Sequence, residues 1–169
     1  MTDRRSQHVV NESELEWTEV RSPSGHAVIQ RKRLAWEAGN RELGCSLTRI
    51  PPGKAFWPEH WHAANEEALY VLGGVGRLRL VGEDVRLVLG DYVAMLAGPQ
   101  GLHALANDGS EDLVVLFIST MREPDVSVYG RTQKIGVFAG AAPGGDASKR
   151  TISKFLRADA EADYWEGEE

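Results

Sequence analysis

Two histidines separated by a single residue lie close to two carboxylates in the sequence HWHAANEEALYVLGG. Residues two apart in an extended strand project from the same face, so His60 and His62 would present their imidazoles together. A carboxylate follows at Glu66 or Glu67, and another histidine, His103, lies about forty residues downstream on a different predicted strand. Three imidazoles and one carboxylate suit a borderline divalent metal such as Zn, Fe, Mn, Ni or Co. The sequence therefore predicts a metal site.

The elements that must position these side chains have the pattern of β-strands. Apolar residues recur mostly with a period of two and are separated by segments rich in glycine, proline, aspartate and asparagine, as in half-buried strands joined by turns. The predicted strands are residues 26–35, 43–50, 66–74, 77–81, 85–89, 91–96, 102–107 and 112–120. Helical signals are weak before residue 148, after which the chain could form a strand or a short helix. Strands at this spacing predict an all-β sandwich or barrel.

Bulk properties restrict the function classes. At 169 residues the chain has about the length of one domain. Its net charge of -6 and pI of 5.4 argue against a nucleic-acid groove, which would need a basic surface. A single cysteine, Cys45, excludes an intrachain disulfide and fits a reducing compartment, and we interpret it as a small buried side chain. No apolar run is long enough to cross a bilayer, so we expect a cytoplasmic protein without membrane partners.

The spacing of the chemical residues resembles the first motif of the cupin superfamily, which runs glycine, His-x-His, glutamate, glycine. Its elements here are Gly53, His60, His62, Glu67 and Gly74, with one extra residue before His60. Glu66 paired with Gly73 also satisfies the spacing. The segment YVLGG matches the pattern YVL-x-G, which is frequent in the family. This alignment makes Gly74 the turn glycine and Glu67 the ligand. Strand alternation agrees, because Glu67 shares a face with Leu69 and Val71.

The second cupin motif begins at Gly90 and is irregular in its middle. Leu96 stands where proline is usual, and the alternative that uses Pro99 as that proline moves the irregularity upstream. In both alignments His103 is the histidine of the motif. Three residues separate it from Asn107, as in the family pattern. Asn107 itself is best explained as the start of an NDG turn.

The resemblance implies an all-β double-stranded β-helix, the cupin jelly-roll barrel, with short N- and C-terminal extensions. We expect one cupin domain over residues 1–169, with a barrel core at about 26–120 and a C-terminal extension at 121–169. The implied metal ligands are His60, His62, Glu67 and His103. The expected apolar walls of the site are Leu69, Val71, Leu78, Leu105 and Phe117.

Several functions fit such a site. The first hypothesis is a metal-dependent enzyme on a small organic substrate, either a dioxygenase or an isomerase or lyase. The catalytic residues are unknown, with Tyr70 and Tyr92 as conjectural proton donors. The alternative is a non-catalytic barrel that binds a sugar or an effector, and a third possibility is a degenerate site on a structural unit. We also expect a homodimer, because exposed strand edges need to be covered.

Neighbouring side chains have simpler explanations. Phe56 and Trp57 suit the core better than the roof of a pocket, and Trp61 alternates away from the histidines and would pack outside the barrel. The arginines on the predicted strands, Arg77, Arg79 and Arg86, are assigned to a solvated face.

Overall fold

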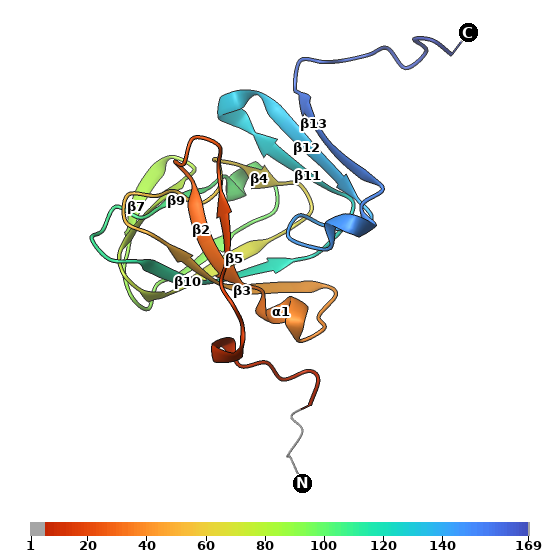
Figure 1. The fold of residues 1–169 in the computed structure, drawn as a ribbon. Helices are drawn as coiled ribbons and strands as arrows, with labels where there is room; N and C mark the ends of the chain where they lie inside the picture. Colours follow the sequence, from red (N-terminus) through yellow and green to blue (C-terminus); the bar gives the residue numbers. More distant parts are fainter. Residues whose placement is uncertain (1–5, 169) are drawn as a thin grey trace.

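The computed structural model describes residues 6–168, which form thirteen β-strands and little helix (Figure 1). The strands are β1 (Thr18–Arg21), β2 (Val28–Lys32), β3 (Leu43–Ile50), β4 (Trp61–His62), β5 (Glu67–Gly73), β6 (Gly76–Leu80), β7 (Glu83–Leu87), β8 (Tyr92–Met95), β9 (Ala104–Ala106), β10 (Leu113–Thr120), β11 (Asp125–Tyr129), β12 (Lys134–Ala139) and β13 (Ile152–Arg157). The α-helix is the single turn α1 (Leu34–Glu37), and four 3-10 turns are η1 (Glu12–Glu14), η2 (Pro99–Gly101), η3 (Gly130–Thr132) and η4 (Ala147–Lys149).

The strands form three antiparallel sheets. The largest has the order β1-β2-β3-β10-β5-β8, a second has the order β13-β12-β11-β4, and a third has the order β7-β6-β9. Strands distant in sequence therefore lie side by side, as β3 and β5 do on the two edges of β10. This arrangement is the predicted all-β cupin jelly roll. In Figure 1 the C-terminal strands β11, β12 and β13 lie along one side of the barrel.

Strand alternation separates the barrel interior from its surface. On β5, Leu69 and Val71 are fully buried, whereas Tyr70 and Leu72 are 40% and 44% exposed. The same alternation on β6, β9 and β10 supplies the other predicted wall residues, so the expected apolar interior is confirmed. The core consists of Ile29, Ile50, Phe56, Leu69, Val71, Leu78, Leu87, Met95, Leu105, Leu113, Val115 and Phe117.

The turn between β5 and β6 explains the run of glycines at its start. Gly74 has a φ of 77°, a left-handed conformation that favours glycine, and a Cβ at this position would collide with the backbone of Asp112. The following strand, β6, pairs with β7 and β9 and not with β5, so this glycine-rich turn leads the chain from one sheet into another and is not a β-hairpin.

Several segments differ from the expected elements, and one of them is β1 (Thr18–Arg21), for which no strand was predicted. The strand predicted at 26–35 ends at Lys32, and α1 follows directly. The ambiguous C-terminal region forms β13 over Ile152–Arg157. β11 and β12 were not predicted, and β11 differs from the other strands because the residues that it buries, Asp125 and Ser127, are polar.

The segment before β1 covers the outer face of β2. Lys32 is buried there, and its Nζ donates to the backbone carbonyl of Glu12 at 2.8 Å and to the Glu12 carboxylate at 2.6 Å. The same ammonium lies 4.8 Å from the ring centre of Trp17. Among residues 6–168, no helix has the length and apolar character that crossing a membrane would need.

Candidate metal site

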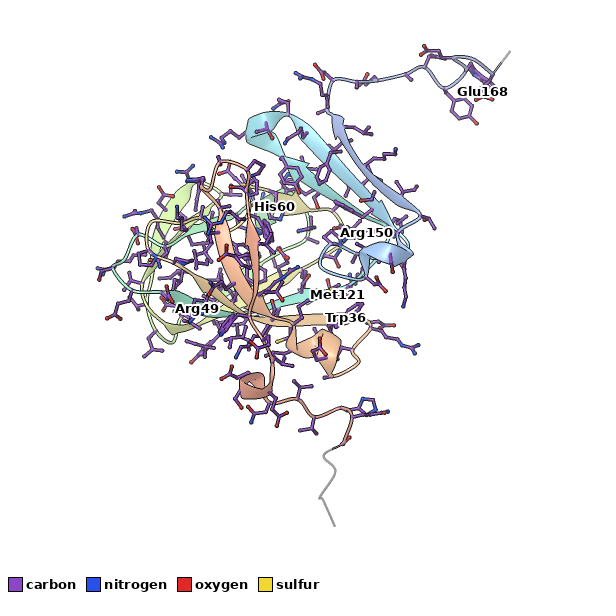
Figure 2. All side chains as sticks on the ribbon, in the orientation of Figure 1. Trp36, Arg49, His60, Met121, Arg150 and Glu168 are labelled. Carbon is purple, nitrogen blue, oxygen red and sulfur yellow. The ribbon has the colours of Figure 1, made fainter. Side chains whose placement is uncertain are left out.

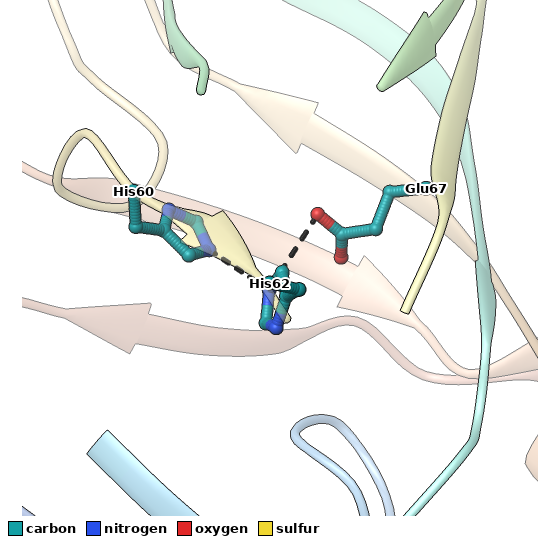
Figure 3. A group of neighbouring side chains, drawn as sticks. All are labelled: His60, His62 and Glu67. Atoms are coloured by element: carbon teal, nitrogen blue, oxygen red, sulfur yellow. Dashed lines mark hydrogen bonds and ion pairs between the residues drawn. The ribbon is translucent and has the colours of Figure 1, made fainter. Parts of the chain in front are cut away.

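Four side chains from three segments of the chain converge inside the barrel. His60 and His103 pair through an isolated antiparallel β-bridge. This bridge places the segment that contains His103 directly beside the segment that contains His60 and His62. His62 lies on β4, and Glu67 is the first residue of β5. Figure 3 shows the rings of His60 and His62 and the carboxylate of Glu67 directed toward one another. Figure 2 places His60 between the barrel strands and the C-terminal sheet.

The potential donor atoms lie close together. The Nε2 atoms of His60 and His62 are 3.1 Å apart, and Glu67 Oε2 lies 3.7 Å from His62 Nε2. His103 Nε2 lies 3.3 Å from the same Glu67 oxygen. The ligand atoms of His60, His62 and Glu67 all fall within 4.8 Å of one another, which is close enough to hold one divalent metal.

Each imidazole is oriented by a bond at its other nitrogen. His60 Nδ1 lies 2.8 Å from the carbonyl oxygen of Pro58, and His103 Nδ1 lies 2.8 Å from that of Gly101. A carbonyl can only accept, so Nδ1 carries the proton and Nε2 presents a lone pair toward the centre. Gly101 is required here, because a Cβ at this position would collide with the backbone of Leu96.

The third ring is held by a carboxylate from the C-terminal sheet. His62 Nδ1 donates to Asp125 Oδ2 at 2.6 Å, and Asp125 Oδ1 accepts from the backbone N–H of Ala64 at 3.0 Å. The hydroxyl oxygen of Ser127 lies 3.2 Å from the same Nδ1. A carboxylate behind a ligating histidine fixes its tautomer and raises its basicity.

The arrangement fits a cation better than it fits a set of hydrogen bonds. His103 Nε2 and Glu67 Oε2 are both buried without a hydrogen-bond partner, and the paired lone pairs of His60 and His62 would repel each other. Donors about 2.1 Å from a common ion lie about 3.0 Å apart at right angles and about 3.4 Å apart at the tetrahedral angle. The observed separations of 3.1, 3.3 and 3.7 Å are of this size.

Burial keeps two of the histidines neutral. It lowers the pKa of His60 to about 3, with further lowering by His103 and His62. Burial also lowers the pKa of His103 to about 4. Neutral imidazoles are the form that binds metals, so neither ring needs to lose a proton near neutral pH.

The charged pair on the other side of the site behaves differently. Burial lowers the pKa of His62, but the hydrogen bond to Asp125 and the nearby Glu67 outweigh it, so this pKa lies above its usual value. Burial raises the pKa of the Asp125 carboxyl, yet its bonds to His62 and to the Ala64 N–H bring that pKa below its usual value. Burial raises the pKa of Glu67, and although the charge of His62 lowers it, that of Asp125 raises it further.

Tyr129 forms a wall of the site that the sequence interpretation missed. Its ring stacks on that of His60, with centroids 5.4 Å apart and an interplanar angle of 13°. Burial raises the pKa of its hydroxyl, and the charges of Asp125 and Glu67 act in the same direction. One signal was present in the sequence, since Asp125, Ser127 and Tyr129 alternate with two valines. Polar residues on one face of a strand can mark a polar interior.

The other conjectured residues lie away from the site. Glu66 is exposed, and Tyr70 and Tyr92 are on the outer face of β5 and β8 at 40% and 64% exposure. The suggestion that these tyrosines donate protons is therefore not supported by their positions. Phe56 is core, stacked on Phe117 at 4.9 Å between centroids.

The remaining predicted polar residues lie at the surface or in turns. Arg77 pairs with Asp108 at 3.0 Å, and Arg79 pairs with Asp84 at 3.3 Å, both on an exposed face. Asn107 closes the expected turn by accepting from the Gly109 N–H at 2.9 Å.

Comparison with known proteins agrees with this site and fold. The cupin domain family matches residues 46–119. A protein from Acidithiobacillus ferrooxidans assigned as a sugar phosphate isomerase is 27% identical, with a TM-score of 0.77 over 92% of this chain and 96% of that chain. A sugar phosphate isomerase of the cupin superfamily from Silicibacter pomeroyi is 23% identical, with a TM-score of 0.75 over 90% and 94% of the two chains.

A more distant structure matches over a shorter segment. A protein from Thermotoga maritima assigned as an oxalate decarboxylase is 24% identical and has a TM-score of 0.57, over 66% of this chain and 97% of that chain. No curated protein sequence matches the chain. The family match, the jelly-roll strand order and these neighbours together show a cupin domain at residues 46–119 of this chain.

Proposed function

We propose that the protein is a metal-dependent isomerase that interconverts an aldose and a ketose, as the free sugar or as a sugar phosphate. The observation that carries this proposal is the match to the Acidithiobacillus protein, which extends over 92% of this chain. It therefore reaches beyond the cupin domain at residues 46–119 into the C-terminal region that supplies Asp125 and Tyr129. The shorter match to the Thermotoga protein covers 66%.

We propose His60, His62, Glu67 and His103 as the ligands of a divalent metal whose identity is Fe, Mn, Ni, Zn or Co. Support comes from their converging donor atoms and from the buried, unpartnered Glu67 Oε2 and His103 Nε2. When bound, such a metal supplies a Lewis acid that polarises a carbonyl or hydroxyl oxygen of the substrate.

The chain's own residues would orient and shield the substrate. Asp125 holds His62 in the tautomer that directs Nε2 inward. Tyr129 packs flat on His60, and we assign its hydroxyl the role of donating a hydrogen bond to a sugar oxygen. The apolar interior limits competing water. Isomerisation moves hydrogen between adjacent carbons of one molecule and requires no second substrate.

The test is an isomerisation assay on a panel of aldoses and aldose phosphates, followed by nuclear magnetic resonance. We expect conversion that stops after chelation and returns with one divalent metal, while a Glu67→Gln variant stays inactive. No conversion of any member of the panel would contradict the proposal. Oxygen uptake would instead favour a dioxygenase, and stoichiometric binding without turnover would favour a sugar-binding protein.

We also propose a homodimer formed through β13. This strand lies at the edge of its sheet, and all six of its residues are exposed, including Ile152, Phe155 and Leu156. An open edge with apolar side chains pairs readily with another strand, and a second copy offers an identical edge. Light scattering should give the dimer mass, and a monomer at micromolar concentration would contradict it. A cytoplasmic location and the domain division at residue 120 remain predictions from the sequence.

A further inference from the structure

An arginine lies on the interior face of the largest sheet. On β2, Arg31 alternates with its neighbours so that it shares a face with Ile29, which is 1% exposed. It is directly opposite Thr48 on β3, and Thr48 is opposite the buried Val115 on β10. Arg31 therefore projects from the same face of the sheet as Glu67 on β5.

This arginine has a nitrogen that lacks a partner within the structure. Its Nε is buried and has no hydrogen-bond acceptor among residues 6–168, although the side chain as a whole is only half-buried. Burial lowers the pKa of Arg31, and the neighbouring Arg33 lowers it further. A buried guanidinium nitrogen without an acceptor costs stability, and an added anion would supply that acceptor.

Polar groups continue from Arg31 toward the metal site. Ser46 and Thr48 lie on the same face of β3, with their hydroxyl oxygens 3.5 Å apart. β3 lies between β2 and β10, and β10 pairs with β5, which carries Glu67. The end of β2 also contacts the C-terminal region, since Arg33 donates to the carbonyl of Gly144 at 2.7 Å. The interior face thus has a cationic end at Arg31 and a metal-binding end at Glu67.

We propose that Arg31 is the binding site for the phosphate group of the substrate. This inference rests on the proposed function and deepens it, because it selects phosphorylated sugars over free sugars. The planar guanidinium donates two parallel hydrogen bonds to a phosphate, and the hydroxyls of Ser46 and Thr48 can complete the site. The substrate would then extend along the interior face, with its reacting carbons at the histidines and its phosphate at Arg31.

Stability provides a first test that needs no ligand. If Arg31 served the fold, its replacement would destabilise the protein, as loss of a structural residue does. A residue retained for binding behaves differently, and Arg31→Gln should melt at the same or a higher temperature in phosphate-free buffer. A clear fall in melting temperature would assign Arg31 a structural role and overturn the proposal.

The binding test uses inorganic phosphate as the probe on the purified full-length protein with its metal. Calorimetry should show that phosphate binds to the wild type. Its affinity for Arg31→Gln should be lower by about tenfold or more. The matched control is Arg86→Gln, since Arg86 is an exposed arginine on β7, and this variant should bind as the wild type does. Phosphate binding that is absent, or equal in all three proteins, would overturn the proposal.

Two further arms separate this inference from the proposed function. Acetate replaces phosphate in the first, and binding of acetate as tight as that of phosphate would refute a phosphate site. The second compares aldose phosphates with the matching free sugars in the isomerisation assay. If free sugars are converted but phosphate binding does not depend on Arg31, the phosphate-site inference would be refuted while the proposed isomerase function would stand. Arg31-dependent phosphate binding without any isomerisation would support the inference and refute the proposed function.

Discussion

The barrel and the C-terminal sheet contribute to the site in different ways. His60 and His103 are both oriented by a carbonyl two residues earlier in the chain, at Pro58 and Gly101. His62 is oriented by Asp125, which lies 63 residues away on β11. Local sequence therefore builds the donor set, while the distant sheet adjusts one ligand and closes the wall. The pKa values follow the same pattern. They are lowered for His60 and His103, which bond to nearby carbonyls, and raised for His62, which bonds to Asp125.

The largest effect on this comparison should come from Asp125→Asn. The asparagine keeps the shape of the side chain but removes the charge that orients His62, so we expect metal affinity to fall about 10- to 100-fold. Competition with a metal-binding dye would measure the change. Affinity equal to that of the wild type would mean that the C-terminal sheet does not act on the metal site.

Removal of the Tyr129 hydroxyl should have a smaller and more selective effect. In Tyr129→Phe the ring can still stack on His60, so metal content should stay the same. Loss of a hydrogen bond to the substrate should lower kcat about tenfold. Steady-state kinetics and metal analysis of the same preparation check both parts, and unchanged kcat would remove Tyr129 from the catalytic wall.

Acid should destabilise the protein after its metal has been removed by chelation. The pKa values of His60 and His103 are about 3 and 4 in the folded state, against 6.5 for a free histidine. The unfolded chain therefore binds two more protons between these limits, and stability falls as the pH drops below 6.5. The raised pKa of Glu67 acts in the opposite direction, because the folded protein takes up this proton at a higher pH than the unfolded chain, but it involves one proton against two. The pKa of His62 is also raised, so its stabilising contribution is fully present below pH 6.5 and does not change the trend.

Urea unfolding at pH 7 and pH 5 measures this effect. We expect a lower midpoint at pH 5 for the chelated protein. A midpoint that is unchanged or higher at pH 5 would show that the two barrel histidines are not held neutral by burial.

The smallest effect is expected at the neighbour of the proposed ligand. Glu66 is exposed, whereas Glu67 faces the histidines, although both satisfied the sequence spacing. Glu66→Gln should change stability by less than about 0.5 kcal/mol and leave the metal in place. Loss of metal in this variant would mean that the strand register around β5 is wrong.

Much of the barrel was predictable because each strand buries one face. Period-two alternation located β3, β5, β6 and β10 from the sequence, and the same alternation favoured Glu67 over Glu66. β11 escaped this logic, since its inward residues Asp125 and Ser127 are polar and buried. Such residues are stabilised by partners distant in sequence, and their alternation with valines does not by itself show which face of the strand is buried.

The donor residues of the site could be predicted from the sequence, but the groups that orient them could not. The His-x-His spacing and the later histidine identified donor atoms, because ligand chemistry depends on residue type. The orienting groups could not be predicted, since two are backbone carbonyls and the third is a carboxylate on a strand that pairs with β4 only in the folded protein. Arg31 lies in the basic run Arg31-Lys32-Arg33, and nothing in that run distinguishes a side chain inside the barrel from one at the surface.

The most direct test of the central claim is the metal content of untagged protein, measured by mass spectrometry for the wild type, His103→Ala and His26→Ala. His26 is an exposed histidine and serves as the matched control. We predict a near-stoichiometric divalent transition metal in the wild type and in His26→Ala, and its loss in His103→Ala. Wild-type protein that holds no metal after reconstitution, or a His103→Ala variant that keeps it, would contradict the proposed metal site.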